Sequence, residues 1–159
     1  MIVVSDTSPI RALNHLGLLP ALERLFGTVL IPPAVASELQ FPRRRFASVD
    51  VASLEFVQVK APSRLHSATQ MDATLDLAET EALSLAIQES ASVLVDESAA
   101  RAAAVRLGLQ VTGTLGILLE AKTCGLIQDV RSYVDRLQHE LGFFISNELR
   151  AAVLQDAGE

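Results

Sequence analysis

The sequence contains no tryptophan, one tyrosine and a single cysteine, Cys124. A lone cysteine cannot form an internal disulfide, which suits a reducing compartment, so we expect a cytoplasmic protein. Aromatic residues make up 4% of the chain, whereas hydrophobic residues make up 50%. The core is therefore expected to consist mainly of aliphatic side chains.

Long apolar runs are also missing. No run is long enough to span a bilayer, and no basic segment of a signal peptide precedes the short apolar run near the N-terminus. We therefore expect no contact with a membrane. The three histidines, His15, His66 and His139, have no partner one helical turn away and no nearby cysteine, which argues against a zinc site.

Positive charge is in short supply, because 13 lysines and arginines face 19 acidic residues and the net charge is −6. This balance argues against nucleic-acid binding by overall charge, but it leaves room for a local basic patch or for a carboxylate cluster neutralised by a metal. The run Arg43-Arg44-Arg45 is the candidate patch. It either contacts RNA phosphates or forms a solvated loop.

What the sequence does contain is an alternation of strand-like and helix-like segments. Its 159 residues suit one domain, residues 1–159, with a sizeable core. Short β-branched or alternating runs predict strands at 2–5, 28–31, 56–59, 92–95 and 109–113. Helical patterns lie between these runs, and two more helices are expected around 129–141 and 146–155. This alternation predicts an α/β fold with a parallel sheet covered by helices on both faces.

Local signals suggest where some helices begin. Ser8 followed by Pro9 predicts a helix with Ser8 as N-cap and Pro9 at the first helical position. Another helix is expected to start at Asp76 and to run through the sequence AETEALSLAIQES. Residues 41–75 are the least regular part of the chain and are expected to form a mixed connector.

Two aspartates stand directly after buried strands. Asp6 follows the run IVVS and Asp96 follows SVLV. Ligands of open parallel sheets bind beyond the carboxyl ends of the strands, so these two side chains would share a crevice if their strands were neighbours. Each aspartate alone could equally shape a turn or cap the helix that follows it.

Glutamates on two predicted helices could join them. Glu38 lies beside the apolar stripe of the helix after Pro32-Pro33, a position that is also common for a glutamate at a stripe edge. Glu79 and Glu81 lie in the first turn of the helix after Asp76, where acids are favoured by the helix dipole. They flank that helix's apolar stripe on opposite sides, so periodicity does not choose between them.

Several carboxylates in one crevice would raise one another's pKa unless a cation neutralised them. Oxygen ligands of this type suit Mg²⁺ or Mn²⁺. Such a site can activate water for attack on phosphorus and stabilise the charge that develops on the phosphate. The set of acids therefore points to phosphodiester hydrolysis.

The sequence resembles the PIN-domain family, in its compact bacterial and archaeal branch that includes VapC-type toxin nucleases and a poorly characterised PIN-like group. The resemblance covers nearly the whole chain, to the ending FFISNELRAAVLQDAGE. The segments that carry it are VVSDTSPI at 3–10, IPPAVASEL at 31–39, LDLAETEALSLA at 75–86, VLVDESAAR at 93–101 and VTGTLGILLEAKTCGLI at 111–127. It implies a three-layer α/β/α sandwich with a central parallel sheet and metal-dependent cleavage of RNA.

The resemblance also implies roles for particular residues. The four acids that would bind the metal and act in catalysis are Asp6, Glu38, Glu79 and Asp96, with Glu81 as the alternative to Glu79 and Glu97 beside the fourth acid. Ser8 and Thr114 match positions where small hydroxyl residues line the site. Apart from the resemblance, the position of Arg101 one turn into the helix after Asp96 would let it orient the acids or bind phosphate, although a partly buried ion pair would also account for it.

The leading hypothesis is a Mg²⁺- or Mn²⁺-dependent endoribonuclease that is the toxin of a toxin–antitoxin pair, with RNA and an antitoxin as partners. The alternative is a PIN-like binding or regulatory protein without nuclease activity. A haloacid-dehalogenase-type phosphatase also has an aspartate after its first strand, but it needs a second one where this chain has Ser8. We further expect a homodimer formed through the aliphatic C-terminal helices.

Overall fold

A computed structural model describes residues 2–159. Within them, five parallel strands form one sheet in the order β3-β2-β1-β4-β5. The strands are β1 (Ile2–Ser5), β2 (Thr28–Ile31), β3 (Val57–Val59), β4 (Ser92–Leu94) and β5 (Val111–Thr112). All five lie within or close to the segments predicted as strands, and every pairing between neighbours is parallel, as the alternation of strands and helices predicted.

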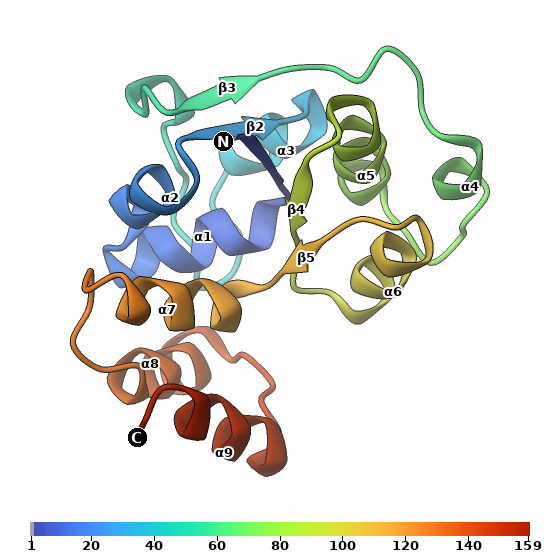
Figure 1. Cartoon of the computed structure of the whole chain (residues 1–159). Helices are drawn as coiled ribbons and strands as arrows, with labels where there is room; N and C mark the ends of the chain where they lie inside the picture. The colour runs from blue at the N-terminus through green and yellow to red at the C-terminus, as the bar shows by residue number, and fades with distance from the viewer. Residues whose placement is uncertain (1) are drawn as a thin grey trace.

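Helices follow the strands in the expected places. The helices are α1 (Thr7–Leu16), α2 (Leu19–Phe26), α3 (Pro33–Leu39), α4 (Ser67–Gln70), α5 (Leu77–Glu89), α6 (Ser98–Arg106), α7 (Thr114–Thr123), α8 (Arg131–Leu141) and α9 (Asn147–Asp156). A short 3₁₀ helix, η1, spans Val51–Ser53. Figure 1 shows the strands in the middle of the molecule and the helices around them.

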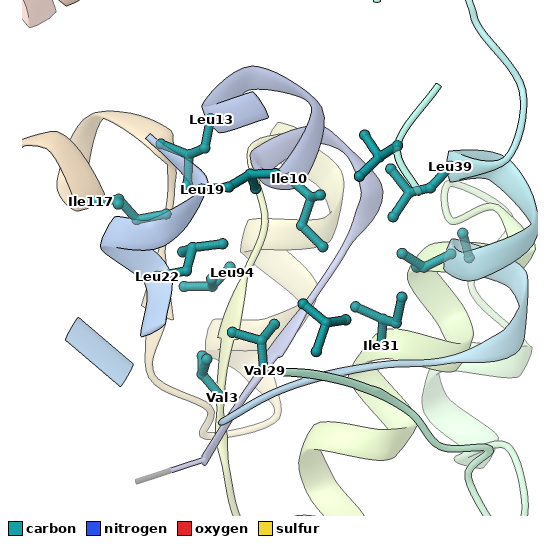
Figure 2. Close-up of a cluster of buried hydrophobic side chains, with 14 residues drawn as sticks. Val3, Ile10, Leu13, Leu19, Leu22, Val29, Ile31, Leu39, Leu94 and Ile117 are labelled. Atoms are coloured by element: carbon teal, nitrogen blue, oxygen red, sulfur yellow. The ribbon is translucent and has the colours of Figure 1, made fainter. Parts of the chain in front are cut away.

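The two faces of the sheet are buried by different helices, because successive side chains of a strand point to opposite faces. Val3 of β1 packs with Ile10 of α1 and Leu22 of α2, in a cluster that also contains residues of α3 and α7. Figure 2 shows this cluster, with the helix side chains facing those of the strands. The next residue of β1, Val4, packs on the opposite face among alanines and leucines of α5 and alanines of α6.

Helices α8 and α9 lie outside this sandwich. Their buried residues, such as Val134 and Val153, pack with Ala12 and Leu16 of α1 and with Leu118 of α7. In Figure 1 they lie below α7, away from the strands. The C-terminal helices therefore thicken one helical layer instead of covering the sheet.

The start of α1 differs from the prediction. The helix begins at Thr7 with Asp6 at the N-cap, so Ser8 as N-cap and Pro9 as first helical residue are wrong. The backbone N–H of Asp6 donates to Leu94 O at 2.9 Å, which is the last link between the β1 and β4 ends. The chain turns directly from that bond into the helix, and no residues are left for a separate cap.

The connector between α3 and α5 is mixed, as expected. It contains η1, the edge strand β3 and the one-turn helix α4. Among residues 2–159, none of the helices combines the length and the apolarity that crossing a bilayer requires.

Candidate functional site

The ends of β1 and β4 create a crevice in the sheet. From β1 the chain proceeds outward through β2 and β3, and then returns to the other side of β1 to form β4 and β5. The strand order therefore reverses between β1 and β4, which is where ligands bind in open parallel sheets. The crevice hypothesis requires β1 and β4 to be neighbours, and they pair in parallel. Asp6 follows β1 and Asp96 follows β4, so both aspartates lie at this edge of the sheet.

Beside the β1 end lies a pocket of about 230 Å³. Three acids predicted to act together, Asp6, Glu38 and Glu79, come from β1, α3 and α5 and all line it. The other residues that line this pocket are Thr7, Ser8, Arg11, Arg43, Arg44, Phe46, Asp76 and Glu97. We call it the acidic pocket.

Asp6 is the most strongly perturbed acid in the pocket. Its side chain is buried, with 5% of the residue exposed, and it makes no capping hydrogen bond although it occupies the N-cap position of α1. Burial raises its pKa to about 7, against a lowering by the Thr7 backbone N–H, and the nearby charges of Glu79, Asp76 and Glu38 add to the rise. A turn-forming or helix-capping aspartate would be exposed or hydrogen-bonded through its side chain, so the simple capping explanation does not describe Asp6.

Glu38 is half-buried and reaches toward α1. The hydroxyl of Thr7 donates a hydrogen bond to its carboxylate. The two residues are 31 positions apart in the chain. This bond turns the glutamate at the stripe edge of α3 into the pocket.

The two candidate third acids have different surroundings. Glu79 is buried and forms a capping box with Asp76, in which Asp76 N–H donates to Glu79 at 2.9 Å and Glu79 N–H donates to Asp76 at 2.8 Å. Burial raises the pKa of Glu79. Glu81 accepts from the backbone N–H of Ala34 at 3.0 Å at the start of α3, and it does not line the acidic pocket.

Asp96 faces a different direction from the other three acids. Its carboxylate accepts from Thr114 N–H at 2.7 Å, from the Thr114 hydroxyl at 2.8 Å and from the Ser8 hydroxyl at 2.8 Å. It thus anchors the start of α7, while Glu97 occupies the N-cap of the helix that directly follows. Asp96 lines a larger groove of about 720 Å³ that also includes Arg101, and Ser8 connects it to the acidic pocket.

The residues predicted to bind substrate have distinct environments. Ser8 lines the acidic pocket, whereas Thr114 is fully buried and uses its hydroxyl and N–H to hold Asp96. Arg101 is exposed and donates to Val95 O at 3.1 Å. Gly113 packs closely beside them: a Cβ there would lie 3.1 Å from the Asp96 carboxylate and 3.3 Å from Val95 O, and it would displace the Arg101 guanidinium.

Sequence reasoning missed several residues of the acidic pocket, among them Thr7, Asp76 and Arg11. Asp76 was expected only as the start of a helix, yet its capping box with Glu79 brings both carboxyl groups to the same end of α5. The pattern of an acid three residues before Glu79 was the available signal. The sequence carried no such signal for Arg11, because an arginine within an apolar helix pattern does not indicate which groups its guanidinium will contact.

The donors of the acidic pocket match a hard divalent cation in their chemistry. Five acids supply carboxylate oxygens, Thr7 and Ser8 add hydroxyl oxygens, and the pKa values of Asp6 and Glu79 are raised, a condition that a bound cation would relieve. Within residues 2–159, however, no three acidic, histidine or cysteine side chains are already grouped closely enough to hold one metal ion. The acids share a pocket, and metal binding would require their side chains to reorient.

A parallel α/β/α sandwich with an acid-lined pocket where its strand order reverses has the architecture of PIN domains. The chain belongs to the PIN-domain family, because residues 2–159 match the model of the DUF3368 family, which is described as a PIN domain. PIN domains are commonly nucleases and typically use divalent metals. This membership removes the haloacid-dehalogenase alternative.

Solved structures agree with the fold. The chain is similar to a PilT N-terminus domain protein from the hyperthermophilic archaeon Sulfolobus solfataricus, with a TM-score of 0.56 and 17% sequence identity over 76% of this chain and 92% of the other. At that identity the likeness supports the fold alone. A search of curated proteins found no significant match.

Proposed function

We propose that the protein is a Mg²⁺- or Mn²⁺-dependent endoribonuclease and that it serves as the toxin of a toxin–antitoxin pair. The observation that carries the proposal is the meeting of Asp6, Glu38 and Glu79 in one pocket, although they lie on three elements far apart in the sequence. Membership of a family whose members are commonly nucleases agrees with this chemistry.

In the proposed reaction, each acid has a distinct part. Asp6, Glu38 and Glu79 hold the cation, which when bound supplies Lewis-acid stabilisation of the charge that develops on the scissile phosphate. Asp96 is held by Ser8 and Thr114, and through Ser8 it fixes the side of the pocket nearest β4. The buried Asp6 carboxyl gains most from a cation, because burial and the charges of Glu79, Asp76 and Glu38 raise its pKa to about 7.

Replacing Asp6 by asparagine tests the proposal. Asp6→Asn keeps the shape of the side chain and removes its charge, so we expect cleavage of a single-stranded RNA in Mn²⁺ to fall at least roughly a hundredfold, since several kcal/mol of transition-state stabilisation are lost. Asp156→Asn, at the exposed end of α9, is the matched control and should cut at the parental rate. Parental cleavage by Asp6→Asn would refute the assignment.

A catalytically silent PIN-like protein is the second candidate. Two observations favour it: no set of three ligands is preassembled among residues 2–159, and the Asp96 carboxylate is occupied by three hydrogen bonds. Titration calorimetry with Mn²⁺ separates the two candidates. Binding that is lost in Asp6→Asn supports the nuclease, and no heat of binding at millimolar Mn²⁺ supports the silent protein.

The toxin role has its own test. Expression of the chain in a bacterial host should arrest growth, and Asp6→Asn should relieve the arrest. A small DNA-binding protein encoded directly upstream should restore growth when it is expressed with the parent. If the protein cuts RNA but its expression does not slow growth, the toxin role fails while the ribonuclease assignment stands.

A further inference from the structure

The three-arginine run forms a tight hairpin at the edge of the acidic pocket. Arg43 N–H donates to Phe46 O at 3.0 Å and Phe46 N–H donates to Arg43 O at 2.9 Å, so Arg44 and Arg45 form the two-residue tip. Arg44 has a φ of 54°, in the left-handed region that such a tip requires. The hairpin, residues 43–46, is therefore a defined structure.

A buried arginine holds this hairpin against the domain. Arg11 of α1 is 6% exposed, and its guanidinium donates to Glu38 O at 2.6 Å, to Phe41 O at 3.0 Å and to Ala47 O at 3.2 Å. The carbonyl groups of Phe41 and Ala47 lie on either side of the hairpin, so one side chain fixes both of its ends. Arg11 also lies 6.0 Å from the centre of the Phe46 ring.

The hairpin presents two of its arginines to the acidic pocket. Arg43 and Arg44 line the pocket together with Asp6 and Glu38. In the described chain, residues 2–159, neither Arg43 nor Arg44 forms an ion pair with a carboxylate. Arg45 does not line the pocket and instead donates to Glu140 O at 3.4 Å, at the end of α8.

Charge explains what these two arginines could do. The pocket is lined by the carboxyl groups of five acids, which repel an incoming phosphate, and the chain as a whole carries a net charge of −6. A polyanionic substrate therefore needs local cations at the pocket edge. Arg11 uses its donors on backbone carbonyls, which leaves Arg43 and Arg44 to offer guanidinium donors beside the acids.

We propose that the Arg43–Phe46 hairpin binds the phosphate backbone of an RNA strand as it enters the acidic pocket, with Arg43 and Arg44 as the phosphate ligands. This inference rests on the proposed function for the nature of the substrate. It assigns the recognition of the strand to residues that take no part in holding the cation.

The test measures binding apart from cleavage. Fluorescence anisotropy of a labelled single-stranded RNA of mixed sequence, in Ca²⁺ buffer over a series of KCl concentrations, compares the parent with the double variant Arg43→Ala/Arg44→Ala. We expect affinity to fall roughly tenfold or more per arginine removed. The slope of log K against log salt should become shallower by about 0.7 for each phosphate that the variant no longer neutralises.

Arg45→Ala is the matched control, because it removes an arginine from the same hairpin on the side away from the pocket. It should keep the parental affinity and salt slope, and circular dichroism should show that all three proteins are folded. Equal weakening of binding in Arg45→Ala would mean that net charge, not the pocket-facing pair, drives binding, and would overturn the inference.

The remaining outcomes separate this inference from the nuclease proposal. If the parent cuts RNA and the double variant keeps the parental affinity and salt slope, the hairpin assignment fails while the nuclease stands. If the parent binds RNA through Arg43 and Arg44 but cuts nothing, the hairpin assignment stands and the nuclease fails. A parent that does not bind the RNA overturns the hairpin assignment.

Discussion

Two aspartates at the ends of adjacent strands have opposite environments. Asp6 is buried and makes no side-chain capping hydrogen bond, and burial raises its pKa to about 7. Asp96 is satisfied by three hydrogen bonds from Ser8 and Thr114. The Asp6 carboxylate would be stabilised by a cation or by a proton, whereas the Asp96 carboxylate is already held in place by its hydrogen bonds.

The raised pKa of Asp6 predicts how stability depends on pH in the metal-free protein. The folded carboxyl retains a proton up to about pH 7, whereas the unfolded one releases it near 3.8. The stabilisation is therefore complete below the unfolded pKa, and the free energy of unfolding falls as pH rises toward about 7. The difference between the pKa of 3.8 in the unfolded chain and about 7 in the folded one corresponds to about 4 kcal/mol at most.

Urea unfolding in EDTA, measured from about pH 5 to about pH 8, checks this prediction. The parent should lose stability across this range. Asp6→Asn should lose much less, since it lacks the carboxyl group whose pKa is raised to about 7. The acids with lowered pKa, Asp72, Glu140 and Glu159, titrate below this range. A parent whose stability is level or rises with pH would contradict the assigned burial of the Asp6 charge.

Residue patterns predicted which acids could meet but not which way each would point. The positions of Asp6 and Asp96 after apolar strands placed them at one crevice on the condition that β1 and β4 are neighbours, which the structure meets. The direction of Asp96 depends on Thr114, 18 residues further along the chain, and that contact is tertiary. Periodicity also could not distinguish Glu79 from Glu81, because the contact that separates them is tertiary: the Glu81 carboxylate accepts from the Ala34 N–H at the start of α3.

At the scale of elements, α5 illustrates how one residue can serve both folding and function. Glu79 closes the capping box at the start of the helix and also lines the acidic pocket. Its carboxyl group is thus held by local hydrogen bonds at the start of α5, the end of the helix that faces the pocket. The capping box explains why Glu79 lies in a first turn.

This double role predicts different results for two substitutions at Glu79. Glu79→Gln keeps an oxygen that accepts from Asp76 N–H, so stability should hold while cleavage is lost with the charge. Glu79→Ala removes the capping bond as well and should also lower the free energy of unfolding by about 1 kcal/mol. Urea unfolding and an RNA cleavage assay on the same preparations separate the two effects.

Glu81→Gln is the control, because its amide oxygen still accepts from Ala34 N–H and it lies outside the acidic pocket. Its cleavage should equal that of the parent. Loss of cleavage in Glu81→Gln, with retention in Glu79→Gln, would show that Glu81 is the third acid.

Element boundaries were predictable where local signals acted alone. The strand runs and the helix after Asp76 were found in the expected places. The start of α1 was missed because the Asp6 N–H is used by Leu94 of a strand far away in the sequence. The hairpin at residues 43–46 was also beyond local prediction, since it is shaped by the three carbonyl contacts of Arg11.

At the scale of the whole molecule, strand order decides the position of the site. Alternating strands and helices predicted a parallel sheet, but alternation does not state that β4 lies beside β1. That adjacency requires the chain to cross from β3 over two strands, and it was a condition of the crevice hypothesis that only the structure could meet. Helices α8 and α9 were both predicted from the sequence, but their position relative to the sheet was not.

Those C-terminal helices lead to the last prediction, a homodimer. The segment that joins them exposes Phe144, with 95% of its surface accessible, and α9 exposes Leu149 beside it along the larger groove. A phenylalanine buries roughly 150–250 Å² when it is covered, so it would make a central contact between two copies. Light scattering should give the parent twice the 17.1 kDa of one chain.

Phe144→Ser should return the mass to that of one chain, because it replaces the apolar contact with a hydroxyl that gains nothing from burial. Met71→Ser is the matched control: Met71 is 85% exposed but follows α4, far along the chain from the C-terminal helices. It should stay dimeric. A monomeric parent would contradict the prediction of a homodimer. If Phe144→Ser remains a dimer, the interface lies on another surface.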